Sequence, residues 1–349
     1  MPVTPDKSID LETRNQVMLE RVKAQAQKEF IPIVLELEEV LNSIVLKEGL
    51  FIKTKKKMNR LRIDSSAIVS GAIGSYLDTD LASSLEDLAA DQSEFEFDAI
   101  NDVVSKSEDD SIATELLVAA FLLLPMSIVG LKRPLLKPFL NDFKNSSVDL
   151  VAAAIRQGFA QGKSTNEILD TIRGTKALKF KDGLLAKITR NHKAIVNTAI
   201  QHVATSSRQE AMKKKDFVRS YQWISVLDSR TTQICRGLSG QVFEFGKGPL
   251  PPKHFNCRSN TAPVIDARFL KGGLSSAGIA STLTYYDWLK DQPEAFQDDA
   301  IGPNRGKLLR DGGLTSEQFS KMSLDKNFEP LTLDDMRRKR PNVFKEAGL

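Results

Sequence analysis

The chain has 349 residues, of which 41% are hydrophobic and 27% charged, and its formal net charge is +4. This composition excludes wholesale disorder, and the length allows two or three domains with cores of their own. Two cysteines exclude a disulfide framework as the basis of the fold.

The N-terminal region is predicted to begin with helix over residues 8–48. Its first 15 residues are polar and lack the pattern of a secretory signal, so we expect the protein to stay in the cytoplasm of the cell that makes it. After Pro32, apolar residues recur at three- and four-residue spacing, and this stripe must pack on another helix of the chain or on a neighbouring subunit. The stripe consists of Ile33, Leu37, Val40, Leu41, Ile44 and Val45.

Charge is distributed unevenly along the next part of the chain. Basic blocks at 53–62 and 173–219 flank an acidic segment at 78–110. Each block is either a solvated face or a surface for nucleic acid or a complementary protein. The candidate DNA-binding cations are Lys53, Lys55, Lys56, Lys57, Arg60 and Arg62.

Two segments between these blocks differ in character. Residues 64–110 are rich in small and then acidic residues, with Gly71 and Gly74 in the first part, and are predicted to form loops and short helices. Residues 112–131 are the most hydrophobic segment, but Pro125 shortens the apolar run below the roughly 20 residues of a membrane span. We predict a buried core helix that is kinked or ends at this proline; a segment that inserts into a membrane is the alternative.

From residue 147 onward the pattern predicts well-defined helices. Ser164 and Glu167 form a capping box that starts one of them. A longer helix is predicted from about residue 184 to residue 212, with apolar residues inward and Arg208 outward. Its two histidines, His192 and His202, lie on opposed faces and are predicted to be surface or helix-packing residues rather than ligands.

The stretch 221–265 carries the residues that are most informative about function. Alternating aromatic and branched side chains predict a strand at its start, and a second strand is predicted over 240–245. Between them we predict a short helix that is capped by Asp228 and ended by Gly237 in a left-handed conformation. Prolines at positions 249, 251 and 252 then predict a loop.

This loop and the short helix hold side chains that can bind zinc. His254 and Cys257 are three positions apart in the loop, and Cys235 is in the last turn of the helix. Zinc prefers four such ligands in a tetrahedron, with Asp228 as a conceivable fourth. The alternatives are two buried thiols with a hydrogen-bonded histidine, or a Cys235–Cys257 disulfide, which a reducing cytoplasm disfavours. No cofactor other than this candidate structural zinc is expected.

The same residues resemble the signature of the Mu F-like minor head proteins, a head morphogenesis family of tailed bacteriophages. In that family the signature runs aromatic, D-x-R-T-x-x-x-C, L-x-G, then P-x-H-x-x-C-R and a proline. Phe255 and Ser259 depart from it, where family members often have proline and a second cysteine, so a metal site built on that cysteine is excluded. The matching residues are Trp223, Asp228, Arg230, Thr231, Cys235, Leu238, Gly240, Pro252, His254, Cys257, Arg258 and Pro263.

With the helices before the signature, the resemblance covers roughly residues 147–265. It implies a mainly α fold with a small α+β domain over that range, in which helices are followed by a short antiparallel sheet and a Pro-rich loop. The expected domains are an α-helical N-terminal region at 1–146, a Mu F-like head morphogenesis domain at 147–270, and a mostly helical C-terminal tail at 271–349. Glycines within 272–278 indicate a flexible joint.

The implied function is that of a minor head protein without enzymatic activity. Such a protein is made in the host cytoplasm, lies inside the virion head near the portal, and assists head assembly, DNA packaging or genome ejection. The expected partners are the portal protein, a scaffold or major capsid protein, and double-stranded DNA bound without sequence preference. Membrane binding is not expected, and self-association through the N-terminal helices is an open alternative.

Within the signature, Asp228, Arg230, Thr231 and Arg258 are expected to form a structural knot, because guanidinium groups donate several hydrogen bonds in a fixed geometry.

The alternative function is a metal-dependent nuclease or toxin-like effector carried in the virion. His254 would then act as a base, with Asp228 holding a cation.

Overall fold

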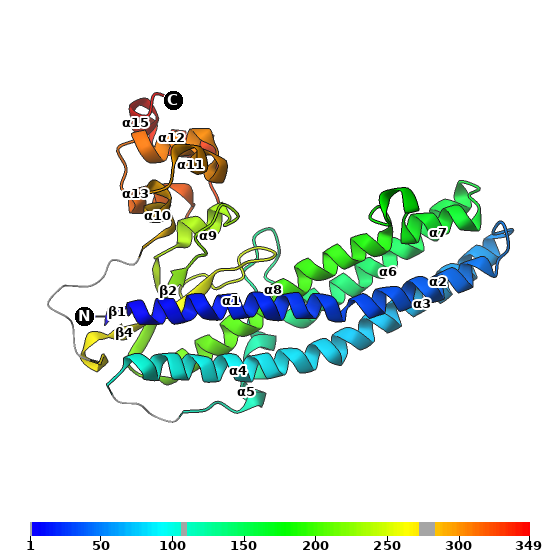
Figure 1. Ribbon diagram of the computed structural model, residues 1–349, viewed down its shortest axis with the longest axis horizontal. Helices are drawn as coiled ribbons and strands as arrows, with labels where there is room; N and C mark the ends of the chain where they lie inside the picture. Colours follow the sequence, from blue (N-terminus) through cyan, green and yellow to red (C-terminus); the bar gives the residue numbers. More distant parts are fainter. Residues whose placement is uncertain (1, 106–109, 272–282) are drawn as a thin grey trace.

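The computed structural model describes residues 2–105, 110–271 and 283–349. The molecule is an elongated helical bundle with a small antiparallel sheet near one end, and a cluster of short helices lies beside that sheet (Figure 1). The predicted fold class, mainly α with a small α+β part, is therefore confirmed.

Helices α1 to α8 form the bundle. α3 packs along α6, α4 packs along α8, and α1 contacts both α4 and α8. One hydrophobic core runs through all of these helices, so the boundary expected between residues 146 and 147 falls inside α6, where the core is continuous. The bounds are α1 Asp6–Glu29, α2 Ile31–Leu46, α3 Lys55–Asp78, α4 Asp80–Val103, α5 Thr114–Leu123, α6 Leu136–Ala160, α7 Thr165–Arg173 and α8 Leu184–Lys214, with a 3-10 turn, η1, at Lys176–Leu178.

The predicted helix over 8–48 is two helices that meet at Phe30, whose ring is fully buried. The apolar stripe on α2 packs into the core of its own chain through Leu37, Leu41 and Val45. Half of the stripe thus packs within its own chain, while Ile33, Val40 and Ile44 are half-buried.

The prediction of loops and short helices over 64–110 is wrong, because α3 and α4 are each 24 residues long. Gly71 and Gly74 cost a helix about 1 kcal/mol each, but buried residues such as Leu61, Val69 and Ile73 place α3 in the bundle core. Tertiary packing of these apolar residues outweighs the low helix propensity of the glycines.

The segment 112–131 is also different from its prediction. α5 ends before Pro125, but it is a surface helix rather than a buried one, since Leu116 and Leu123 are 61% and 71% exposed while Leu117 and Phe121 face the core. α5 contacts α4, α6 and α8 on one side, and its other side is open to solvent. No helix in the described part of the chain is long and apolar enough to cross a membrane.

The sheet has the order β1-β4-β2-β3, and every neighbouring pair is antiparallel. The two predicted strands correspond to β2 and β3, whereas β4 replaces part of the predicted loop. β4 tolerates Pro263 because β1 pairs only with Ile265 and Asp266, so the side of Pro263 away from β2 has no strand partner that needs its missing N–H. The bounds are β1 Pro2–Val3, β2 Val218–Ile224, β3 Val242–Glu244 and β4 Asn260–Asp266, and a 3-10 turn, η2, follows at Ala267–Phe269.

The C-terminal segment folds into short helices with a core of their own. It packs on α9 (Gln233–Leu238), the short helix between β2 and β3 (Figure 1). The glycine-rich joint expected at 272–278 lies outside the described residues. The bounds are α10 Tyr285–Lys290, α11 Glu294–Ile301, α12 Pro303–Asp311, α13 Ser316–Ser323, α14 Leu333–Lys339 and α15 Pro341–Glu346.

Candidate functional site

The end of β2 and the helix α9 are joined by a chain of buried hydrogen bonds. Trp223 is fully buried at the end of β2, and its Nε1–H donates to the hydroxyl of Ser225 over 3.0 Å. That hydroxyl donates in turn to the carbonyl of Cys235 over 2.7 Å. The indole therefore fixes where α9 places the first cysteine.

The ends of α9 differ from the prediction. Thr232, not Asp228, is the N-cap residue, and Gly237 lies inside the helix, while the left-handed glycine is Gly240 with φ +80°. A Cβ on Gly237 would come within 2.8 Å of Leu324. This glycine is needed because the C-terminal segment packs directly on the helix, not because the helix ends there.

Asp228 is the centre of a knot of polar side chains. Its carboxylate accepts two hydrogen bonds from the guanidinium of Arg258, both 2.8 Å, and one from the hydroxyl of Thr231 at 3.1 Å. Burial disfavours the charge, but Arg258 outweighs it and the pKa of Asp228 falls to about 2. Arg230 is mainly exposed and makes a looser contact of 3.5 Å. The structure thus brings the four residues together, with Arg258 as the main partner.

Cys235, His254 and Cys257 converge on one point. Their ligand atoms all lie within 4.8 Å of one another. Sγ of Cys235 is 3.1 Å from Nε2 of His254 and 3.8 Å from Sγ of Cys257. Both cysteines are free and buried, and the loop that carries His254 begins at the buried Pro252. The arrangement can hold a soft metal ion or form a disulfide.

The electrostatics of the two thiols differ. Burial and the neighbouring Cys257 raise the pKa of Cys235 well above its usual value. Burial also disfavours a Cys257 thiolate, but hydrogen bonds from Cys235 and His254 outweigh it and lower the pKa of Cys257 well below its usual value. A thiolate next to a histidine is a nucleophile in many enzymes, but Cys257 is fully buried and out of reach of a substrate.

Residues 149–262 match the family model described as Phage Mu protein F like protein. This segment is Mu F-like. The match confirms the resemblance over almost the span expected, and it supports a role of the protein in phage head morphogenesis. No curated protein and no solved structure matches the chain.

The N-terminal helix α1 holds the Mu F-like signature in place through a buried lysine. Lys23 is 2% exposed, and its ammonium donates to the carbonyl of Cys257 over 3.2 Å and to the side chain of Gln201 over 2.8 Å. Gln201 donates to the carbonyl of Ser259. Nothing in the sequence marks Lys23 as buried, because it lies among solvent-exposed charged residues of an ordinary polar helix.

A second buried network contradicts the prediction that Arg208 points outward. Its guanidinium is fully buried and donates to the carboxylate of Glu12 on α1 and to the side-chain oxygen of Asn260 on β4. The reason is that α8 is covered by α1, α4 and the sheet, so residues 196–209 are all buried. Glu96 on α4 is buried beside this group.

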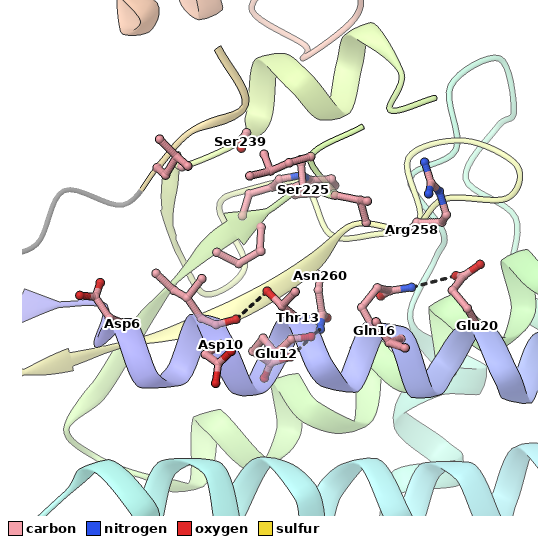
Figure 2. Close-up of a pocket in the computed structure, with 18 residues that line it drawn as sticks. Asp6, Asp10, Glu12, Thr13, Gln16, Glu20, Ser225, Ser239, Arg258 and Asn260 are labelled. Carbon is pink, nitrogen blue, oxygen red and sulfur yellow. Dashed lines mark hydrogen bonds between the residues drawn. The ribbon is translucent and has the colours of Figure 1, made fainter. Parts of the chain in front are cut away.

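A cavity of about 700 Å³ lies between α1 and the Mu F-like segment. Figure 2 shows α1 along one side with Asp6, Asp10 and Glu20, and Ser225, Ser239 and Arg258 on the other side. Asp10 and Glu20 are paired with Arg14 and Lys23 at 2.9 and 2.7 Å, so much of this negative charge is already opposed. Ile9, Val17 and Leu227 also line the cavity, which therefore suits an apolar protein segment.

The nuclease alternative needs Asp228 to hold a cation near His254, but the structure pairs Asp228 with Arg258.

His192 and His202 are both helix-packing residues. His192 stacks on Phe30 with 3.7 Å between ring centroids. The Nε2–H of His202 donates a hydrogen bond to the carbonyl of Phe121. Burial lowers the pKa of His192 to about 3 and that of His202 to about 4, so both are neutral at pH 7.

The candidate DNA-binding cations lie at the end of the bundle farthest from the sheet (Figure 1). Lys53 precedes α3, and the other five occupy its first turns, with only Arg62 half-buried. The start of α7 is attached to this end, since the backbone N–H of Thr165 donates to the carbonyl of Leu50 over 3.0 Å. The fold therefore brings two separate basic segments to one end of the molecule.

Proposed function

We propose that the protein acts near the portal of a phage head in assembly, DNA packaging or genome ejection, as a binding protein rather than an enzyme. The match of residues 149–262 to the Mu F-like family is the observation that supports a role in the phage head. We further propose that DNA is bound by a surface called here the basic end, defined as residues 47–62 together with residues 163–193.

The charge of the basic end supports DNA as its ligand. Residues 47–62 contain seven Lys or Arg and one Glu, and residues 163–193 contain eight Lys or Arg and three Asp or Glu. The resulting excess of eleven positive charges is larger than the net charge of +4 of the whole chain. Such a concentration of cations attracts the DNA backbone without reading its sequence.

Most of these cations are free to contact phosphates. Lys57 pairs with Glu48 at 3.2 Å, and Arg60 is a looser 3.8 Å from Asp64. Lys53, Lys55 and Lys56 are exposed and make no ion pair with the residues that the structure describes. Binding to DNA would therefore cost few existing contacts.

Protein partners are proposed to bind elsewhere. The cavity between α1 and the Mu F-like segment suits an apolar segment of the portal protein or of a scaffold or capsid protein. The α2 stripe contributes Leu37, Leu41 and Val45 to the core of its own chain, which leaves little of it for self-association.

The test is DNA binding by fluorescence anisotropy at several salt concentrations. A variant with Lys53, Lys55, Lys56 and Arg60 changed to Gln should bind a random duplex more weakly, with the slope of log affinity against log salt reduced by about 3 to 4. A matched control changes Arg21, Lys28, Lys247 and Lys326 to Gln, four exposed cations outside the basic end, and should keep most of that slope. Equal losses in both variants would refute a DNA site at the basic end.

The role at the portal is tested separately, by asking whether the tagged protein co-purifies with portal-containing heads from infected cells. Recovery of the protein from heads that lack DNA would support a protein contact independent of the basic end. Its complete absence from heads would refute the head role even if DNA binding persisted.

A further inference from the structure

We propose that Cys235, His254 and Cys257 bind one zinc ion, with a water molecule as the fourth ligand. The site is internal to the Mu F-like segment and independent of the portal and DNA contacts. The spacing of the ligand atoms, the orientation of the histidine and a small polar cavity beside two of the three side chains support it.

The spacing of the ligand atoms fits a tetrahedral ion. Zinc binds thiolates at about 2.3 Å, so two sulfurs at corners of a tetrahedron are about 3.8 Å apart. The two Sγ atoms of Cys235 and Cys257 are 3.8 Å apart. Nε2 of His254 lies 3.1 Å from Sγ of Cys235, a few tenths of an ångström closer than a bound ion requires.

The histidine is oriented as a ligand. Its Nδ1–H donates to the carbonyl of Phe255 over 2.8 Å, which leaves the lone pair of Nε2 directed at the cysteines. Metal-binding histidines are held in this way by a partner on their other nitrogen, which fixes the tautomer and the ring plane.

The protein also holds both cysteines from behind. The carbonyl of Cys235 accepts from Ser225, and the carbonyl of Cys257 accepts from the buried ammonium of Lys23. With two thiolate ligands, the net charge of the sulfurs and Zn²⁺ would be zero.

The fourth position is supplied by a cavity of about 20 Å³ that is lined by Cys235, His254, Thr232 and Ser259, among others. A water molecule requires about 10–15 Å³ and two or more polar partners. The hydroxyl of Thr232 is buried at this cavity, where it can contact a water as well as the thiol of Cys235. Three protein ligands and one water form an open zinc site, unlike the closed four-residue sites of zinc fingers.

The experiment measures metal in the full-length protein purified under reducing conditions. The wild type is expected to contain one zinc per chain, to lose it to a strong chelator, and to take up one equivalent when zinc is added back. Cobalt added in place of zinc is expected to give the charge-transfer absorption of a thiolate complex. Cys235→Ala, Cys257→Ala and His254→Ala are each expected to lower the zinc content to near zero.

The control is Ile234→Val, which trims a buried neighbour of Cys235 and keeps all three ligands, so its zinc content should equal that of the wild type. If the ligand variants do not fold, the wild-type titration alone decides. Reduced wild-type protein that binds no stoichiometric zinc and shows no cobalt–thiolate band would overturn the proposal. A Cys235–Cys257 disulfide in protein taken directly from the cytoplasm would also overturn it.

Discussion

Arg208 on α8 and Glu12 on α1 form an ion pair in which both side chains are completely buried, although 196 positions separate them in the sequence. The pair joins the first helix of the chain to the longest one, at the point where both meet strand β4. Because neither charge reaches water, the stability of this junction depends on each partner being present.

Removing one member of the pair should therefore be costly. Arg208→Ala leaves a buried carboxylate without its cation, and we expect the free energy of unfolding to fall by about 3–5 kcal/mol. Arg190→Ala, on the exposed side of the same helix, is the matched control and should change it by less than about 0.5 kcal/mol. Chemical denaturation measures both. A small effect of Arg208→Ala would mean that water or another group reaches Glu12.

The buried carboxyls should make stability depend on pH. Burial, and then the charge of Glu12, raises the pKa of Glu96 well above its usual value, and burial raises that of Glu12 against the opposing charge of Arg208. An acid whose pKa is raised in the folded state binds more protons there than in the unfolded chain. The stabilisation is therefore complete below the unfolded pKa of about 4 and is lost as pH rises through the folded pKa.

The variant Glu96→Gln isolates this effect. The groups facing Glu96 and Glu12 are Arg208, Asn260 and Asn15, of which only Arg208 is charged. Replacing the carboxyl by an amide should make the melting temperature less dependent on pH above about 4 than in the wild type. Parallel curves of melting temperature against pH for the two proteins would show that Glu96 does not titrate in this range.

The Asp228–Arg258 pair should have the opposite pH dependence. The pKa of Asp228 is lowered to about 2, so its stabilisation is present above the unfolded pKa near 4 and is lost as pH falls towards 2. The two side chains are 30% and 19% exposed, so after discounting for solvent we expect Asp228→Asn to cost about 1–2 kcal/mol at pH 7. Glu317→Gln, which breaks the exposed pair with Lys321, should leave stability close to that of the wild type. Equal effects of the two variants would contradict a special role for Asp228.

Two glycines inside helices should respond to alanine with opposite signs. At Gly237 the new Cβ would lie 2.8 Å from Leu324, so the C-terminal segment must shift, at a cost of about 1–3 kcal/mol. At Gly71 on α3 the new Cβ meets no atom within 4 Å, and the higher helix propensity of alanine should add about 0.5–1 kcal/mol of stability. Thermal unfolding of the two variants measures the contrast, and a stabilised Gly237→Ala would show that Leu324 does not pack on α9.

The features that could be predicted from the sequence depend on residues a few positions apart. The capping box of Ser164 and Glu167 formed as predicted, because both bonds close within one turn. The periodicity of α8 and the alternation in β2 likewise reflect local geometry. The signature was recognisable because its spacing places His254 and Cys257 three positions apart on one loop.

Only the tertiary structure decided which distant residues meet. α3 and α4 were missed because their helical state depends on packing in the bundle rather than on propensity. Arg208 was misplaced because a charged residue gives no local sign that its part of the helix is covered by other elements. Tertiary packing also brings Cys235 to His254 and Cys257. It likewise brings two basic segments to one end of the bundle. Such contacts depend on the free energy gained when the whole core is buried. A short window of sequence cannot show which distant residues share that core.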